Sequence, residues 1–183
     1  DCGSCHGAPA GGWKIAGSVT EVCRGCHDEI GSEKYPHTAV AAKGCLGCHR
    51  AHAAREKTLL RAPGPALCFT CHPRPRFAQQ TVHDPVREGD CGACHPAHGA
   101  ANEHLLTRPF PIEQYVLFAP DRYGLCLECH DEGALSDPER GGDTGFANGT
   151  QNLHALHLRD RVSQSELGTR VQPGITCRNC HEP

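Results

Sequence analysis

The amino-acid sequence predicts a chain of mostly irregular coil with short α-helices and little or no β-sheet. Two observations point to this class. First, 21 glycines and 14 prolines are spread over 183 residues, so long regular elements are interrupted through much of the chain. Second, one Trp, three Tyr, five Phe and no Met leave little apolar volume for a core. A bound group must therefore fill the interior that side chains cannot.

Composition also argues against two kinds of partner. The formal net charge is −3, whereas a nucleic-acid binder is expected to be strongly basic. No apolar run approaches the ~18 residues that a membrane span requires, and the best one, residues 115–119, stops at Pro120. We expect no nucleic-acid partner and no membrane span.

All 14 cysteines fall in one pattern, C-x-x-C-H, which predicts the short helical turns of the chain. This pattern is the attachment signature of c-type haem. Two thiols three positions apart on a tight turn can each add to one vinyl group of the same porphyrin edge, and the next residue then carries the proximal imidazole of the iron. Seven covalently bound c-type haems follow. The seven motifs are Cys2/Cys5/His6, Cys23/Cys26/His27, Cys45/Cys48/His49, Cys68/Cys71/His72, Cys91/Cys94/His95, Cys126/Cys129/His130 and Cys177/Cys180/His181.

Other uses of paired cysteines fit this pattern less well. Tetrahedral zinc needs four ligands, and zinc gives no reason for a histidine after every second cysteine. The cysteine run that holds bacterial iron–sulfur clusters is absent. Redox-active disulfides within C-x-x-C occur in enzymes, but seven of them exceed what one redox site needs. Haem is the interpretation that explains all seven motifs together.

A second set of seven histidines equals the number of motifs and supplies candidate distal ligands. Because the chain has no Met, His/Met ligation is impossible, and bis-histidine irons are low-spin, coordinatively saturated and of low potential. Two alternatives stay open: one or two of these histidines lie on the surface, or a partner chain supplies a ligand. The seven are His37, His52, His83, His98, His104, His154 and His157.

An internal repeat organises the motifs into one heptahaem domain, residues 1–183. GCLGCHRAHAAREKTLL from Gly44 aligns without a gap with DCGACHPAHGAANEHLL from Asp90, at an offset of 46. The predicted segments are a lone N-terminal haem segment 1–22, repeat units 23–67 and 68–125, and an extended unit 126–183. The last unit carries His154 and His157 three positions apart in a predicted short helix, so each could serve a different haem.

This unit resembles the doubled C-x-x-C-H family of multihaem cytochromes over His37–His72 and His83–His130. A looser resemblance to tetrahaem cytochrome c3, in which a histidine eight residues before the first cysteine caps that same haem, implies that His37 caps the haem at Cys45 and His83 the haem at Cys91. His52 and His98 follow their proximal ligands by three residues on the same turn, so they should bind neighbouring haems.

Two further features remain open. Arginine outnumbers lysine among the 18 basic residues, and arginine pairs well with haem propionates, but a GC-rich genome produces the same bias. The apolar stretch 109–118 is expected to form a haem cover or an extended arm in preference to a binding surface.

These observations favour electron transfer over catalysis. Saturated, closely spaced haems exchange electrons, whereas a catalytic haem needs a vacant position, and the C-x-x-C-K variant of such enzymes is absent. We therefore expect no enzyme. Redox partner proteins or extracellular electron acceptors are the expected partners.

Two forms of electron transfer compete. Haem attachment from residue 2 to residue 181 suggests exposed end haems and head-to-tail self-association into an extracellular filament, similar to cytochrome nanowires. The alternative is a soluble periplasmic shuttle. The resemblance to c-type cytochromes implies export in either case, and the chain, which opens at Asp1 without an apolar leader, is expected to be the mature form.

Overall fold

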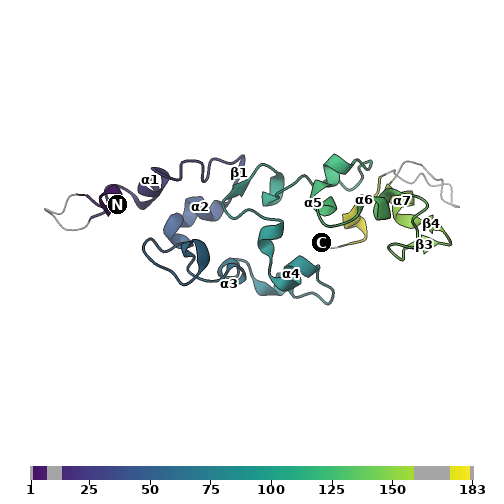
Figure 1. The fold of residues 1–183 in the computed structure, drawn as a ribbon, viewed down its shortest axis with the longest axis horizontal. Coiled ribbons are helices and arrows are strands. Elements are labelled where there is room, and N and C mark those ends of the chain that lie inside the picture. Colours follow the sequence, from purple (N-terminus) through teal and green to yellow (C-terminus); the bar gives the residue numbers. More distant parts are fainter. Residues whose placement is uncertain (1, 8–13, 159–173, 182–183) are drawn as a thin grey trace. The chain divides into compact units, whose positions relative to one another are not determined.

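A computed structural model describes residues 2–7, 14–158 and 174–181 (Figure 1). The backbone is mostly irregular, with short helices and two two-stranded sheets, so the predicted fold class is confirmed. The chain divides into two compact units, Asp1–Thr107 and Arg108–Pro183. This boundary falls inside the predicted segment 68–125. The single domain and its four repeat-based segments stay a prediction.

The first unit contains four α-helices of five or six residues joined by 3-10 turns. The helices are α1 (Val19–Arg24), α2 (Thr38–Lys43), α3 (Gly64–Cys68) and α4 (Asp84–Glu88), and the 3-10 turns are Cys2–Ser4, Cys45–Gly47, Lys57–Leu59, Arg74–Phe77, Cys91–Ala93 and Glu103–Leu105. Strands β1 (Tyr35–Pro36) and β2 (Gly99–Ala100) pair antiparallel, with Tyr35 opposite Ala100. This small sheet joins the two repeats of the unit.

The two copies of the repeat have closely similar backbone conformations. Four non-glycine residues in the described part of the chain have positive φ, and they form two equivalent pairs: Thr58 and Leu59 in one copy, His104 and Leu105 in the other, all between 54° and 58°. Non-glycine residues rarely adopt this left-handed conformation. Its occurrence at the same two positions shows that the sequence repeat is also a structural repeat.

The second unit contains the 3-10 turn Pro120–Tyr123, helices α5 (Gly124–Leu127), α6 (Glu132–Ser136) and α7 (Leu153–Leu158), and the 3-10 turn Cys177–Asn179. Strands β3 (Ala147–Asn148) and β4 (Gln151–Asn152) form a hairpin immediately before α7 (Figure 1). Asn152 is fully buried and holds this region together. Its Nδ2 donates to the carbonyls of Ala134 and Asp137, both at 2.8 Å, and its Oδ1 accepts from the amides of His154 and Ala155 in the first turn of α7.

The stretch 109–118 forms no helix or strand, and it contacts the segment before the seventh motif. Tyr115 forms a bridge with Ile175, and the Val116 amide donates to the Gly174 carbonyl at 2.8 Å. Gly174 has φ +75°, and a Cβ at this position would overlap the Val116 carbonyl. Only glycine permits this close approach of the two backbones.

Few side chains are buried. In the described residues the buried apolar ones are Ala100, Tyr123, Ala155 and Leu158. Eight large hydrophobic side chains are at least 40% exposed, including Leu59, Phe77 and Phe146. Side chains alone do not form a continuous core, which agrees with an interior built around bound groups. None of the described helices has the length and apolar character needed to cross a membrane.

Candidate haem-binding site

All seven C-x-x-C-H motifs adopt the same closed turn. In each motif the amide of the histidine donates to the carbonyl of the first cysteine, at 2.8–3.0 Å. This is the hydrogen bond of one helical turn, and it brings the two thiols and the imidazole toward one side of the backbone. The local geometry that haem attachment needs is therefore present at every motif.

Along the chain, the first cysteine of each motif lies alternately in a 3-10 turn and in an α-helix. The first, third, fifth and seventh begin with a 3-10 turn at their first cysteine: Cys2–Ser4, Cys45–Gly47, Cys91–Ala93 and Cys177–Asn179. The second, fourth and sixth place that cysteine in the last turn of α1, α3 and α5. The start of α1 shows why a helix forms there: Ser18 and Glu21 make a reciprocal capping box two residues before Cys23.

Histidines of the two sets face each other in pairs. Each pair joins one histidine from a C-x-x-C-H motif with one from the second set, and the ring planes are inclined by 16–32°. The ring centroids are 5.9 Å apart for His6 and His52, 6.3 Å for His37 and His72, 6.0 Å for His49 and His98, and 6.4 Å for His154 and His181.

These separations fit one iron between the rings. A metal–imidazole bond is about 2.0 Å long and the ring centre lies about 1.1 Å beyond the nitrogen, so two imidazoles on opposite faces of one iron have centroids about 6.2 Å apart. The observed range is 5.9–6.4 Å. The residues present therefore fit bis-histidine haem at four of the motifs.

Hydrogen bonds at Nδ1 orient several of these imidazoles. A backbone carbonyl can only accept, so a neutral ring bonded to it carries its proton on Nδ1 and leaves the lone pair of Nε2 for a metal. Orientation of metal-binding histidines by such bonds is common. The bonds join Nδ1 of His37 to Ala97 O (2.8 Å), of His49 to Thr58 O (2.8 Å), of His95 to Leu105 O (3.0 Å) and of His157 to Leu153 O (2.6 Å).

The structure corrects the pairing that the resemblance to cytochrome c3 implied for His37. This histidine faces His72, whereas the distal side of His49, in the Cys45 motif, is taken by His98. The reason is the β1–β2 sheet. The His37 amide donates to the His98 carbonyl at 2.8 Å, so the two histidines lie on paired backbones and their rings serve different motifs. The corresponding assignment of His83 to the haem at Cys91 stays a prediction; His83 is the N-cap residue of α4.

His52 and His98 follow a common rule. Neither faces the histidine of its own motif: His52, from the third motif, faces His6 of the first, and His98, from the fifth, faces His49 of the third. In both cases the histidine that follows the motif faces the imidazole of the motif two places earlier in the sequence. Each of these motifs, which ends in C-H-x-x-H, thus contributes an imidazole to a distant motif and links the two in space.

Six histidines belong to none of these four pairs: His27, His83, His95, His104, His130 and His157. His27 and His95 belong to motifs but face no second imidazole within the described chain, and His104 and His157 are exposed. His157 lies one turn after His154 on α7, and Phe146 contacts both rings, at centroid distances of 5.0 Å to His154 and 5.7 Å to His157.

The environment of His154 favours the form that binds iron. Burial lowers the pKa of this imidazole, and the neighbouring His181 and His157 lower it further. The ring is therefore held in the neutral state, in which one nitrogen keeps a free lone pair for a metal.

The first cysteines of successive motifs approach each other in pairs. Cys23 is hydrogen-bonded to Cys45, Cys68 to Cys91 and Cys126 to Cys177, so each predicted repeat unit brings its two motifs together. Burial, followed by the partner thiol, raises the pKa of Cys23 and of Cys68. The hydrogen bond with Cys126 instead lowers the pKa of the Cys177 thiol to about 7.

The second cysteines of the motifs are more exposed than the first. Only Cys2 among the first cysteines is exposed, because the others are at least half-covered where the motifs meet. Among the second cysteines, Cys48 and Cys94 are half-buried, and the exposed ones are Cys5, Cys26, Cys71, Cys129 and Cys180.

This exposure differs from what a thiol enclosed in a haem pocket would show. The polypeptide does not bury Cys26, Cys129 or Cys180, although the sequence predicts all three as attachment residues. The physical reason is that each lies one turn beyond the first cysteine, away from the neighbouring motif that covers that cysteine. A porphyrin edge bonded to both thiols would itself cover the second one. Haem attachment through these three cysteines, as through the other cysteines of the seven motifs, stays a prediction that rests on the motif and its closed turn.

Weaker electrostatic effects connect the motifs within the first unit. Cys5 raises the pKa of Cys23, and Cys48 raises the pKa of Cys68. Thiols of the first motif therefore lie near those of the second, and thiols of the third near those of the fourth. The sequence alone does not predict this proximity. The sequence also gives no sign of the role of Tyr123. This residue is 1% exposed and packs on Phe118 at a ring-centroid distance of 5.2 Å. It lies near the thiols of the sixth and seventh motifs.

Closed C-x-x-C-H turns and facing imidazoles define a multihaem c-type cytochrome, a protein of electron transfer. The model of the family described as "Doubled CXXCH motif" matches residues 37–77 and 83–135. The chain belongs to this family. No curated protein sequence matches the chain.

Proposed function

We propose that this protein carries electrons along a row of seven low-potential c-type haems. The observation that carries the proposal is the set of facing imidazole pairs, each combining a motif histidine with a histidine of the second set. An iron bound on both faces has no position for a substrate but can still change its oxidation state. The chain of neighbouring cysteines in the first unit supports haem positions that follow the order of the motifs.

In this role each haem supplies the redox chemistry, and the chain holds and insulates it. The thiols of each motif hold the porphyrin edge, and the motif histidine holds the iron. The carbonyls bonded to Nδ1 of His37 and His49 keep each Nε2 directed away from the backbone bond. No residue of the chain is assigned a catalytic role.

The first experiment counts haems and determines their spin state. Intact mass and the pyridine haemochrome spectrum of the exported protein should give seven haems per chain. The EPR spectrum of the oxidised protein should be low-spin for the four irons between the pairs that include His6, His49, His72 and His181. A high-spin signal of the parent protein that responds to nitrite or hydroxylamine would instead indicate a catalytic haem and an enzyme.

A second observation favours an extracellular filament formed by head-to-tail association. His27 and His95 face no imidazole in the described chain, while His157 is exposed and has its Nδ1 bonded to its own helix. The chain thus combines a motif histidine without an assigned distal partner, His27, with an exposed histidine of the second set, His157. Donation of Nε2 from one copy to an iron of the next is a heterologous contact, which propagates if it does not close into a ring. The alternative is a soluble periplasmic shuttle whose end haems dock redox partners.

Dilution separates these possibilities. If a second copy supplies a ligand, the high-spin fraction in EPR should rise as dilution dissociates the assembly, and His157→Ala should abolish assembly in light scattering. Leu156→Ala, next to it and also exposed, is the matched control. A monodisperse particle of one 19.6 kDa chain plus haem, with a spin state independent of concentration, would exclude the filament and favour the shuttle.

A further inference from the structure

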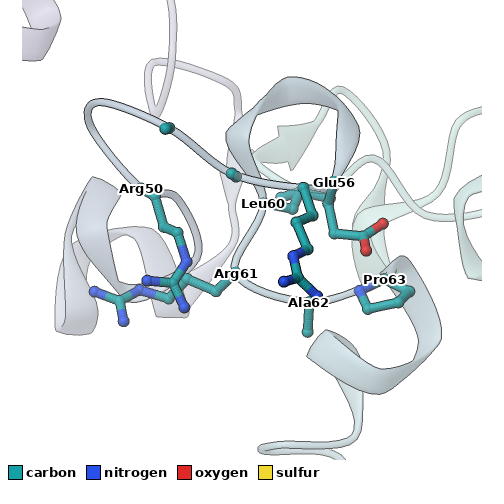
Figure 2. Close-up of a pocket in the computed structure, with 9 residues that line it drawn as sticks. Arg50, Glu56, Leu60, Arg61, Ala62 and Pro63 are labelled. Carbon is teal, nitrogen blue, oxygen red and sulfur yellow. The ribbon is translucent and has the colours of Figure 1, made fainter.

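A pocket of ≈ 540 Å³ lies on the loop between the third and fourth motifs (Figure 2). Three of its lining residues are arginines: Arg50, Arg55 and Arg61. Figure 2 shows the side chains of Arg50 and Arg61 extending toward the same side, with Glu56 toward the other. The rest of the lining is small or apolar: Ala53, Ala54, Leu60, Ala62 and Pro63.

The arginines are specific to one copy of the repeat. At the offset of 46, Arg50 corresponds to Pro96, Arg55 to Ala101 and Arg61 to Thr107. The backbone that carries them is nevertheless the same: the Arg61 amide donates to the Cys48 carbonyl, and the Thr107 amide donates to the Cys94 carbonyl, both at 2.9 Å. The fold of the loop therefore does not require arginine, so the three side chains are available for another interaction.

None of the three guanidinium groups is neutralised within the described chain. No carboxylate of the described residues lies within 4.0 Å of them, although other arginines such as Arg108 and Arg140 do form ion pairs. Arg61 uses Nε to donate to the Leu46 carbonyl at 2.6 Å. This bond ties the side chain to the C-x-x-C turn of the third motif and leaves its two terminal nitrogens available as a bidentate donor.

The pocket is lined by residues that directly follow two predicted axial ligands. Arg50 directly follows His49, and Ala53 directly follows His52. These histidines face two different partners, His98 and His6, so the loop separates two haem positions. A haem edge beside this loop would place apolar carbon against the alanines and Leu60, and its carboxylates near the arginines.

From this arrangement we infer that Arg50, Arg55 and Arg61 form a carboxylate site that binds the propionates of a haem held by this loop, either the haem at Cys2 or the haem at Cys45. The inference rests on the proposed function, because it requires those haems. Positive charge near an iron opposes its oxidation, so the arginines raise the midpoint potential of the haem that they contact. The site thereby separates the potential of the haem that it contacts from the potentials of haems without neighbouring arginines.

The test replaces the arginines by the residues of the second copy, in the fully loaded protein. Arg55→Ala and Arg61→Thr are combined, and both replacements are compatible with the loop because Ala101 and Thr107 occupy the same backbone. Arg76→Ala, an exposed arginine outside the pocket, is the control. To follow one haem at a time, the distal ligand is removed: His52→Gly makes the haem at Cys2 high-spin, and His98→Gly the haem at Cys45.

EPR-monitored redox titration of each tagged haem should show a lower midpoint potential when the arginines are replaced. A fall in the His52→Gly background assigns the site to the haem at Cys2, and a fall in the His98→Gly background assigns it to the haem at Cys45. The propionate bending band in resonance Raman should shift in the same background. Arg61→Lys should largely keep the midpoint potential of the parent but still shift this band, because lysine keeps the charge but not the bidentate geometry.

If neither haem shifts beyond the effect of Arg76→Ala, the inference is wrong. The haem count of the parent protein keeps this result separate from the proposed function. A chain without its haems overturns the function, whereas a fully loaded chain whose potentials ignore the arginines overturns only the carboxylate site.

Discussion

His37 and His72 face each other with ring centroids 6.3 Å apart and ring planes inclined by 24°. His37 stands eight residues before Cys45, yet it is turned toward the following motif. The Ala97 carbonyl, 2.8 Å from its Nδ1, and the β1–β2 pairing hold it there. A contact between the two repeats, distant in sequence, thus decides which motif this histidine serves.

Removal of the His37 imidazole should open the iron of the fourth motif, at Cys68. We expect His37→Ala to convert one haem from low-spin to high-spin, because the distal nitrogen is lost while the motif histidine remains. EPR of the oxidised protein measures this change, and Arg76→Ala, at an exposed residue that is no candidate ligand, provides the comparison.

Haem-deletion backgrounds identify which iron has changed. When Cys68 and Cys71 are replaced by serine, His37→Ala should add no further high-spin signal, whereas it should do so when Cys45 and Cys48 are replaced. The opposite result would restore the assignment of His37 to the haem at Cys45.

Asn152→Ala should destabilise the second unit. The buried side chain accepts from the His154 amide at 3.0 Å and donates to two carbonyls, so its loss leaves buried polar groups without a partner and removes the cap of α7. A cost of about 2–3 kcal/mol is expected from these effects, together with partial loss of low-spin signal at the haem of Cys177, because α7 carries His154. Denaturant unfolding measures the stability. Asn148→Ala, at an exposed position of β3, should be nearly neutral; equal costs at both positions would contradict the role of the cap.

Tyr123 should make the second unit sensitive to alkali. Burial raises its pKa from the ordinary 10.0 to about 12, with smaller contributions from Cys177 and Cys126. The unfolded chain releases the phenol proton first as pH rises, so stability is complete below pH 10.0 and is lost as the pH rises toward about 12. Two pKa units correspond to about 2.7 kcal/mol.

Tyr123→Phe tests this origin. The hydroxyl is buried and finds no hydrogen-bond partner in the described part of the chain, so its removal should be neutral or stabilising at pH 7. Between pH 10.0 and 12 the variant should lose less stability than the parent in thermal unfolding. An equal loss of stability in the variant and in the parent would assign the alkaline transition to other groups.

Gly174→Ala should disrupt the pairing of the stretch 109–118 with the segment before the seventh motif. The added Cβ would overlap the Val116 backbone, and φ is +75°. Substitutions at two other glycines distinguish the steric cost of the added Cβ from the conformational cost of the positive φ. Gly149 has φ +61° but open space around its Cβ position, so Gly149→Ala measures the conformational cost alone, about 1 kcal/mol. Gly142 has neither feature, and Gly142→Ala should be within about 0.5 kcal/mol of the parent. Equal losses at Gly174 and Gly149 in thermal unfolding would exclude the steric contact.

Much of the local structure could be predicted from the sequence. The coil-rich fold follows from glycine, proline and scarce aromatics, and the turns at the motifs follow from their five-residue pattern. Asn152 and Tyr123 could not be found in this way, since a polar or aromatic residue in a coil-rich chain gives no sign of burial until the segments around it are brought together.

The sequence by itself determined the seven places at which haem is expected to attach and which histidine follows each, because both depend on five consecutive residues and on bond lengths that do not vary. The tertiary structure decided which imidazoles face each other. That choice depends on where distant segments meet: the pairing of Tyr35 with Ala100 turns His37 toward His72 and leaves His98 opposite His49. A covalent motif is a local property, whereas a distal ligand is the result of the packing of the whole unit.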